Sequence, residues 1–542
     1  MDKTIALAQI NTIALDIEGN LKKALEYIDK TADADVVIFC GAYLCGGVYK
    51  DVMKKFPIIE QNVQTALEFV AKNTDKQVLM GVVKSGKESV AVIENGTVKI
   101  VSSSTECVNV AGLKTSFIFR NEGDVNPSHE AELIIDFTGS VSKRNSEFVR
   151  NSSLSLLAKL TNAYVIQVNR VGANDELSFD GASRIYDNSG KLVARAEFFK
   201  EDLLIIKEAG EIKDMPQGME KEPEEEFTLN YECDLERTYL SLCQATRDYF
   251  RKNGLKRAVL GLSGGLDSTI CAVILTDALG AENVLGVSMP SHITSDLSKQ
   301  DAYVLAKNLG IEFREVPISP MVQEFTNAFK TFDWCEKCEN SYTMDNFQAR
   351  VRATILFGIS NEYKSCIPIA TSDKSEAYMG YATINGDMSG GFAIILDVTK
   401  TKLFALGKWL NEHRKEKNAI PTSILEKRPG AELAINPKTG KPLLAEEALM
   451  PYEFLDEVIW RIEILHQSKE ELKAQTYFYE KTHSVSAEEK SQWIDKFFYR
   501  MTGAICKANL MPVFPLIDEV STNKKVYNAP ITSKINYESI KL

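Results

Sequence analysis

The sequence predicts an α/β protein built from two domains and a linker. Short apolar strands alternate with amphipathic helices through residues 1–208 and again through residues 229–542. Residues 209–228 between them are acidic and carry Pro216 and Pro223, a composition typical of a solvated linker. A chain of 542 residues is also too long for one hydrophobic core. We therefore expect two domains with these boundaries.

Composition excludes several classes of protein. The net charge of −12, without a Lys/Arg-rich run, argues against a nucleic-acid partner. No apolar run approaches the roughly 20 residues that a membrane span needs. A strand is expected from Thr4 onwards, which leaves no room for a signal peptide, and the ten cysteines have no framework spacing. We expect a cytoplasmic protein with reduced thiols. The lone pair Cys335 and Cys338 could bind zinc, but two ordinary thiols are the favoured reading.

A glycine-rich turn lies between an apolar strand at 258–262 and a helix at 270–279. Glycines let the backbone approach an anion closely, and a helix N-terminus directs N–H groups at it. A carboxylate in this turn repels phosphate unless a Mg²⁺ ion lies between them. No Gly-Lys-Ser/Thr closes the turn, so it is not a Walker A loop. The predicted ATP-binding residues are Gly261, Leu262, Ser263, Gly264, Gly265, Leu266, Asp267 and Ser268. The alternative is a tight turn in an unrelated α/β domain.

The second half predicts a doubly wound parallel sheet, in which ligands lie at the carboxyl ends of the strands. One strand, 283–288, ends at Met289, and another, 367–370, delivers Thr371 and Glu376 to the same edge. Glu376 is then a second carboxylate for Mg²⁺ beside Asp267. Lys400 follows later, where it could meet phosphates as a point charge. Considered alone, a surface lysine is the favoured reading.

A long helix beginning near Asp345 carries Asn346, Gln348, Arg350 and Arg352, which could bind a dinucleotide. For this stretch alone, a solvent-facing basic helix surface is the favoured reading. Asp387 lies among many glycines, which indicates backbone packed close to a ligand or an ordinary glycine-rich loop.

The second half resembles the NAD⁺ synthetases, which are N-type ATP pyrophosphatases. The motifs are NFQARVRATI (346–355), TSDKSE (371–376), GYATINGDMSGGFA (380–393), ILDVTKT (395–401) and PYEFLDEV (451–458). The resemblance implies that the turn cradles ATP phosphates, with Met289 and Thr371 beside the nucleotide. It implies that Asp267 and Glu376 hold Mg²⁺ and that Lys400 neutralises the β- and γ-phosphates. Asn346, Arg350, Glu376 and Asp387 are then the residues for the deamido-dinucleotide.

The first half resembles the nitrilase superfamily, an α-β-β-α sandwich, in the form found as the amidase domain of glutamine-dependent NAD⁺ synthetases. The matching motifs are IALAQIN (5–11), IENGTV (93–98) and QVNRVGANDELSFDG (167–181). That family uses a Glu-Lys-Cys triad. Here Gly41 stands at the Glu position, Phe119 at the Cys position, and residues 100–117 are too short for the loop that carries the Lys. A nucleophile rebuilt from Cys40, Cys45 or Cys107 is the alternative, with His129 as the one histidine of this half.

The sequence thus predicts an ammonia-using NAD⁺ synthetase. It would act on nicotinic acid adenine dinucleotide, ATP and ammonia, with Mg²⁺, and the resemblance implies a homo-oligomer. One rival is a glutamine-dependent enzyme with a rebuilt or partner-supplied glutaminase; another is a nucleotide-sensing pseudoenzyme. Three departures from the family pattern stand at Ser372 with Asp373 (TSDKSE for TGNKSE), at Gly430, where Ser or Thr is usual, and at Tyr499, in place of a basic residue.

Overall fold

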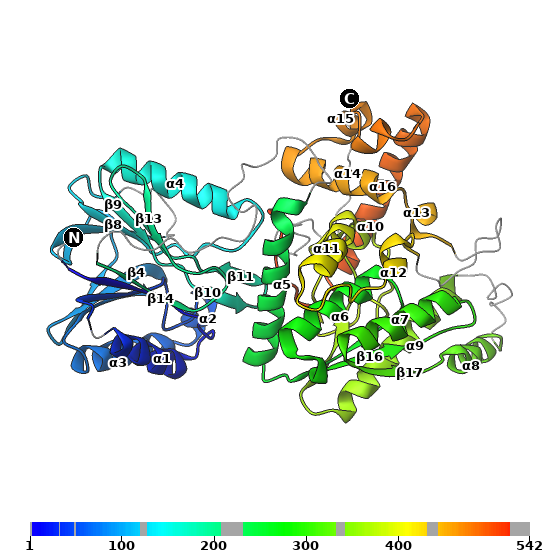
Figure 1. The fold of residues 1–542 in the computed structure, drawn as a ribbon, viewed down its shortest axis with the longest axis horizontal. Helices are drawn as coiled ribbons and strands as arrows, with labels where there is room; N and C mark the ends of the chain where they lie inside the picture. Colours follow the sequence, from blue (N-terminus) through cyan, green and yellow to red (C-terminus); the bar gives the residue numbers. More distant parts are fainter. Residues whose placement is uncertain are drawn as a thin grey trace. The chain divides into compact units, whose positions relative to one another are not determined.

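The computed structural model describes residues 3–31, 33–47, 50–119, 127–207, 231–331, 342–430 and 443–520. The chain divides into two compact units, Met1–Pro223 and Glu224–Leu542 (Figure 1). The linker predicted at 209–228 lies outside the described residues, and so do Cys335 and Cys338. Among the described helices, none is long and apolar enough to cross a membrane.

The first unit contains two six-stranded sheets. One has the order β14-β1-β2-β3-β4-β5, with a parallel centre at β1, β2 and β3 and antiparallel edges. Its strands are β1 (Ile5–Gln9), β2 (Val36–Phe39), β3 (Gln77–Lys84), β4 (Lys87–Glu94), β5 (Thr97–Val101) and β14 (Asp202–Ile206). β1 and β2 are buried along their whole length, as expected for largely apolar strands at the centre of a sheet.

The other sheet has the order β13-β12-β9-β8-β7-β6. Its strands are β6 (Val108–Val110), β7 (Leu113–Ile118), β8 (Leu133–Asp136), β9 (Tyr164–Gln167), β12 (Arg184–Tyr186) and β13 (Leu192–Arg195). A separate hairpin pairs β10 (Val171–Asn174) with β11 (Leu177–Asp180). The hairpin of β6 and β7 was not predicted from the sequence.

Helices cover the outer faces of the two sheets. On one side lie α1 (Ile17–Lys30) and α3 (Ile58–Lys72), and on the other lies α4 (Ser146–Thr161), while the short α2 spans Lys50–Lys55 (Figure 1). The main apolar cluster joins side chains of both sheets, such as Phe39 and Ile135, so the sheets pack face to face. The predicted α-β-β-α sandwich is confirmed.

The second unit contains a five-stranded parallel sheet in the order β17-β16-β15-β18-β19. Its strands are β15 (Arg257–Gly261), β16 (Val284–Ser288), β17 (Glu312–Glu315), β18 (Cys366–Ala370) and β19 (Phe392–Ala393). The chain winds from β15 to β17 in one direction and then returns to β18 on the other side of β15. The carboxyl ends of β15 and β18 therefore flank the switch point, where such sheets bind ligands. The predicted parallel sheet is confirmed.

The helices of this unit surround the sheet and continue into a helical C-terminal part (Figure 1). They are α5 (Glu232–Lys252), α6 (Leu266–Leu279), α7 (Asp296–Leu309), α8 (Ser319–Phe329), α9 (Tyr342–Glu362), α10 (Lys374–Met379), α11 (Lys400–His413), α12 (Thr422–Glu426), α13 (Ala445–Ala448), α14 (Tyr452–Leu465), α15 (Lys469–Ala474) and α16 (Ala487–Ala508). Two 3₁₀ turns span Ala281–Asn283 and Phe478–Lys481.

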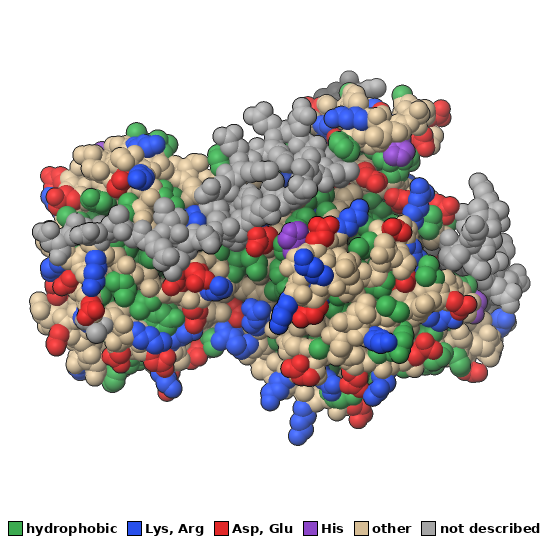
Figure 2. All heavy atoms as spheres, in the orientation of Figure 1, with side chains coloured by type: hydrophobic (Ala, Val, Ile, Leu, Met, Phe, Trp, Pro, Cys, Tyr) green, Lys and Arg blue, Asp and Glu red, His purple; other side chains and the backbone are tan. Residues whose placement is uncertain are grey.

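Acidic and basic side chains are intermixed on the face of the molecule drawn in Figure 2. The expectation that no nucleic acid binds stays a prediction.

Candidate active site

The glycine-rich turn connects β15 to α6 and is closed tightly against α7. Gly264 has a φ of +75°, and a β-carbon there would lie 2.2 Å from the carbonyl oxygen of Ser298. Glycine is required at this position for both its conformation and its size. The Gly265 N–H donates to Ser263 Oγ at 3.2 Å, and the hydroxyl oxygens of Ser263 and Ser268 are 3.2 Å apart. The turn thus gathers backbone N–H groups and two hydroxyls at the start of a helix.

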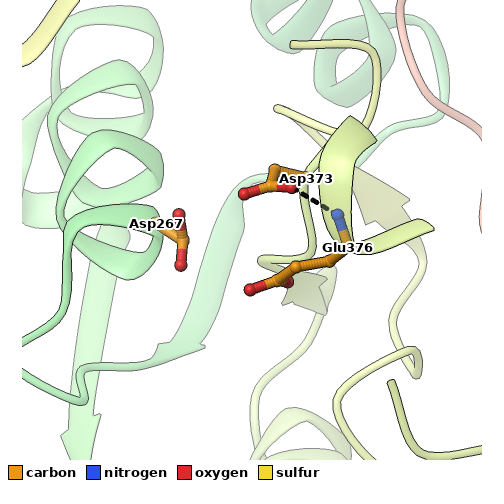
Figure 3. Close-up of side chains that lie close together, drawn as sticks. All are labelled: Asp267, Asp373 and Glu376. Atoms are coloured by element: carbon orange, nitrogen blue, oxygen red, sulfur yellow. Dashed lines mark hydrogen bonds between the residues drawn. The ribbon is translucent and has the colours of Figure 1, made fainter. Parts of the chain in front are cut away.

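Three carboxylates and one lysine meet beside this turn. Asp267 comes from the first turn of α6, whereas Asp373 and Glu376 come from the N-terminal end of α10, and their carboxylates point toward one another (Figure 3). One oxygen from each of the three lies within 4.8 Å of the others. Lys400 Nζ lies 2.7 Å from Asp267 Oδ1, 2.7 Å from Asp373 Oδ2 and 3.2 Å from Glu376 Oε1.

Burial sets the electrostatics of this cluster. It raises the pKa of the Glu376 and Asp373 carboxyls, because a charged carboxylate loses its hydration there. Burial also lowers the pKa of the Lys400 ammonium, but the three carboxylates outweigh it and raise that pKa well above its usual range. Lys400 therefore stays charged, and it offsets part of the repulsion among the carboxylates.

The backbone of Lys400 is fixed by a hydrogen-bonded chain that joins three helices. Its N–H donates to Ser375 Oγ at 2.9 Å, and Ser375 in turn donates to Asp456 Oδ1 of α14 at 2.5 Å. Asp456 also accepts from the N–H and hydroxyl of Thr401, and burial raises the pKa of Asp456 to about 7. This network holds the start of α11 against α10, so Lys400 enters the cluster from a rigid position.

A cavity of 260 Å³ opens beside the cluster. Of the residues predicted for ATP, the metal or the dinucleotide, its lining contains Gly261, Leu262, Ser263, Gly265, Leu266, Asp267, Met289, Thr371, Glu376, Asp387 and Lys400. Gly264, Ser268, Asn346 and Arg350 are not in the lining. Gly264 instead packs against Ser298, and the Ser268 hydroxyl accepts from the Ser263 N–H and donates to the Gly265 carbonyl within the turn.

Three of the residues predicted for the dinucleotide contact the loop that follows α10. Asn346 Oδ1 accepts from the Thr383 hydroxyl at 2.8 Å, and Asp387 Oδ1 accepts from the Thr383 N–H at 2.6 Å. Arg350 lies on an exposed part of α9 and donates to the Ile384 carbonyl at 3.2 Å. These contacts hold the loop after α10 in place. Asn346 and Arg350 contact this loop and do not line the cavity.

Arg352, which the sequence singled out on the long helix, also lines the cavity. Three basic side chains that the sequence did not single out line it as well: Lys299, Lys427 and Arg428. Lys427 donates to the Ser298 hydroxyl, next to the carbonyl that contacts Gly264. Asp373 is another residue that the sequence analysis did not assign to the site. Its position just after β18, two residues from Thr371, could have predicted that it lies at the site.

The three departures from the family pattern have different surroundings. Ser372 and Gly430 both line the cavity, and Ser372 is buried. Tyr499 is 83% exposed on α16, whereas its neighbour Arg500 lies over the ring of Tyr381, a cavity residue, at 5.9 Å. Of this pair, Arg500 is therefore the residue that approaches the cavity residue Tyr381.

In the first unit, the position of the expected amidase glutamate is closed. A β-carbon on Gly41 would lie 2.2 Å from the Phe137 carbonyl oxygen, so no side chain fits without a shift of the backbone. The Gly41 carbonyl accepts a hydrogen bond from Arg170, whose other terminal nitrogen donates to the Gly46 carbonyl. An arginine bound to backbone carbonyls thus packs against this position.

Phe119, at the position of the expected nucleophile, is part of an aromatic cluster. It is buried, and its ring is stacked on that of Phe137, with the centroids 6.3 Å apart, and lies 6.2 Å from that of Phe117. Residues 120–126 after it lie outside the described part. The segment at 100–117, predicted to be too short for the lysine loop, contains the hairpin of β6 and β7.

The cysteines considered as replacement nucleophiles have different environments. Burial raises the pKa of the Cys40 thiol, and it raises that of Cys45 to about 11, so both are protonated near neutral pH. Cys107 is partly exposed.

The acidic cluster fits a hard divalent cation. Mg²⁺ takes oxygen ligands and is usually held by one or two carboxylates together with substrate phosphates. Three carboxylate oxygens lie close together beside the glycine-rich turn, and two of these carboxylates, Asp267 and Glu376, line the cavity. Lys400 Nζ occupies the space among them in this structure, so a cation would have to share the carboxylates with it.

Comparison with known proteins points to one group of enzymes. The family model described as NAD synthase matches residues 238–494. A glutamine-dependent NAD⁺ synthetase of Synechocystis sp. is 32% identical over 523 residues, which are 86% of this chain and 90% of that protein. One of Aquifex aeolicus is 33% identical over 84% of this chain and 88% of its own.

Solved structures of similar proteins cover nearly the whole chain. The glutamine-dependent NAD⁺ synthetase of Acinetobacter baumannii, solved with adenosine diphosphate, superimposes with a TM-score of 0.70, at 25% identity, over 97% of each chain. That of Cytophaga hutchinsonii superimposes with a TM-score of 0.79 over 98% of each chain; at 19% identity it shows a shared fold.

Proposed function

The chain belongs to the family of glutamine-dependent NAD⁺ synthetases, and we propose that this NAD⁺ synthetase takes its nitrogen from ammonia. The nicotinate carboxylate of nicotinic acid adenine dinucleotide attacks the α-phosphorus of ATP and releases pyrophosphate. Ammonia then attacks the acyl carbon of the adenylate, loses a proton, and displaces AMP to give NAD⁺.

The observation that carries the synthetase assignment is the meeting of Asp267, Glu376 and Lys400 in one cavity with the glycine-rich turn. In our proposal the N–H groups and hydroxyls of the turn bind the ATP phosphates, and Thr371 and Met289 lie beside the nucleotide. Lys400 faces the outer phosphates as a point charge.

Asp267 and Glu376 are the residues that we propose for Mg²⁺. When bound, the ion would neutralise charge that develops on the phosphates as pyrophosphate leaves. Both carboxylates keep an exposed edge, with 24% and 17% of their side chains accessible, so they can reach a ligand in the cavity. Asn346, Arg350 and Asp387 order the loop for the dinucleotide.

Ammonia dependence is supported by the first unit. Glutamine hydrolysis needs a nucleophile, a base and an oxyanion stabiliser held together. Gly41 has no space for a glutamate side chain, Phe119 fills the nucleophile position with an aromatic ring, and the nearby thiols Cys40 and Cys45 are held protonated. We propose that this unit is a pseudo-amidase that is kept for its fold.

Glutamine is the second candidate donor. The similar enzymes of Synechocystis and Aquifex are named glutamine-dependent, and their similarity extends over the first unit as well. A glutaminase rebuilt at another position of this chain, or supplied by a partner, would satisfy that reading.

One assay separates the two donors. The purified chain is given nicotinic acid adenine dinucleotide and MgATP with either ammonium or glutamine, and NAD⁺, AMP and glutamate are measured. We expect saturable NAD⁺ synthesis with ammonium, rising with pH because NH₃ is the nucleophile, and none above background with glutamine. Stoichiometric glutamate from glutamine would overturn the proposal. Glutamate released only after a second protein is added would favour a partner glutaminase.

We also propose that the enzyme is cytoplasmic and a homo-oligomer. Fractionation of the source cells tests the first, and light scattering of the purified chain tests the second; a monomer at working concentrations would refute it.

A further inference from the structure

Asp373 differs from the other two carboxylates of the cluster in what it can reach. Its side chain is fully buried and is absent from the cavity lining, whereas Asp267 and Glu376 both line the cavity. A ligand in the cavity therefore meets Asp267 and Glu376 first. Asp373 contacts the Lys400 ammonium without lining the cavity itself.

The two oxygens of Asp373 have separate tasks. Oδ1 accepts a hydrogen bond from the Glu376 N–H at 2.8 Å and so caps α10, the helix that carries Glu376 (Figure 3). Oδ2 lies 2.7 Å from Lys400 Nζ, and within the described part of the chain it has no partner with hydrogen-bond geometry. The contact of Oδ2 with Lys400 is thus an attraction between charges.

We propose that Asp373 is a positioning residue that holds the Lys400 ammonium when Asp267 and Glu376 bind a divalent cation. This inference rests on the proposed function, because it assumes that these two carboxylates serve the cation. Lys400 has three anionic partners, and two of them are then shared with the ion. The buried Asp373 remains, and its attraction is screened little by salt or water.

The same contact favours cation binding. Without the charge of Asp373, Lys400 would depend on Asp267 and Glu376 alone and would compete with the cation for both. Groups behind the direct ligands of a metal typically change its affinity by about 10- to 100-fold when they are replaced. A loss of that size is expected when only the charge of Asp373 is removed.

Asparagine separates the charge of Asp373 from its capping role. In Asp373→Asn an oxygen can still accept from the Glu376 N–H, whereas in Asp373→Ala both the cap and the charge are lost. We would measure Mn²⁺ binding to the full chain without substrates by electron paramagnetic resonance, the KM for ATP, kcat with ammonium, and Tm.

We expect Asp373→Asn to keep the Tm close to that of the wild type, to weaken Mn²⁺ binding by about tenfold or more, and to raise the KM for ATP. If Asp373→Asn binds Mn²⁺ as tightly as the wild type while Asp373→Ala is unstable, Asp373 is only a helix cap and the inference fails.

A double-mutant cycle with Lys400→Met tests whether Asp373 acts through the lysine. In the Lys400→Met background, Asp373→Asn should change Mn²⁺ affinity much less than it does in the wild type. An equal loss in both backgrounds would make Asp373 a direct metal ligand and overturn its positioning role. These binding measurements need no turnover, so failure of the wild type to form NAD⁺ would refute the proposed function and not this inference.

Discussion

A β-carbon on Gly41 would lie 2.2 Å from the carbonyl oxygen of Phe137, and one on Gly81 would lie 2.3 Å from the α-carbon of Gly41. Backbone therefore closes on Gly41 from two sides, and neither contact is with a flexible side chain. Gly41→Ala should lower the free energy of unfolding by about 1–3 kcal/mol, as overpacked cores do, and Gly41→Glu by more. Urea unfolding of the full chain, followed by near-UV circular dichroism, measures the change.

Gly139→Ala is the matched control in the same unit. Its β-carbon would meet only side-chain atoms at 3.4 Å or beyond, so we expect a small change in stability.

The combined variant Gly41→Glu with Phe119→Cys should release no glutamate from glutamine, because a lysine partner is still missing and the three groups act as a unit. Glutaminase activity in that variant would show that the former site is intact.

Glu147 stabilises the first unit through buried arginines, and this stabilisation should depend on pH. Burial raises the pKa of Glu147, but Arg150 and Arg184 outweigh it and lower that pKa from 4.5 to about 2. Because the folded pKa is below the unfolded one, the stabilisation is complete above about pH 4.5 and is lost as the pH falls toward 2. Its size is roughly 3 kcal/mol.

Glu147→Gln should therefore destabilise the chain at pH 7 and leave Arg150 and Arg184 poorly paired. The difference from the wild type should shrink as the pH drops below 4. Urea titrations between pH 3 and pH 7 measure it. Glu130→Gln, which removes a carboxylate from an exposed pair with Lys114, is the control and should change little. A gap that stays constant over this pH range would mean that the charge of Glu147 is not what stabilises the unit.

Gly264 should be indispensable for nucleotide binding. Alanine there would combine a φ of +75° with a contact of 2.2 Å to the Ser298 carbonyl, so the turn must shift. We expect Gly264→Ala to weaken the binding of ATP by about tenfold or more, since the N–H groups lose their alignment. Equilibrium dialysis with ATP measures this.

Gly265→Ala, next in the same turn, meets only the hydroxyl of Ser263 at 3.2 Å and should be milder. Equal effects of the two substitutions would contradict the role given to the backbone of Gly264.

The sequence was sufficient to predict the parallel sheet and the meeting of several candidate residues at one cavity. Asp267, Thr371 and Glu376 each follow an apolar strand within a few residues, and parallel strands end at one edge of a sheet. Residues that follow different strands in the sequence therefore lie close together at that edge of the sheet. Gly41 and Phe119 were identified differently, from the resemblance to the amidase family, and each lies just after a strand of the sandwich.

The remaining residues depend on contacts that no local pattern encodes. Lys427 and Arg428 reach the cavity from beyond α12, far along the chain from the glycine-rich turn. Asp373 is next to predicted residues, yet its burial and its pairing with Lys400 follow from the docking of α11 on α10. Asn346 and Arg350 were predicted to bind the dinucleotide, which stays a prediction; in the structure they contact Thr383 and Ile384 of the loop after α10.

Asp267→Asn should abolish the formation of AMP and leave the fold intact. Asp267 Oδ1 is 2.7 Å from Lys400 Nζ. Of the three carboxylates in the acidic cluster, Asp267 and Glu376 are the two that line the cavity. Asparagine keeps the shape but removes the charge that a divalent cation requires, so stabilisation of charge on the departing pyrophosphate is lost. A loss of about 10²-fold or more in kcat with ammonium is expected. Glu376→Gln should do the same.

Glu324→Gln, which removes an exposed carboxylate from α8, is the control and should retain full activity. Near-normal AMP formation by Asp267→Asn, at a Tm equal to that of the wild type, would refute the assignment of Asp267 to the cation.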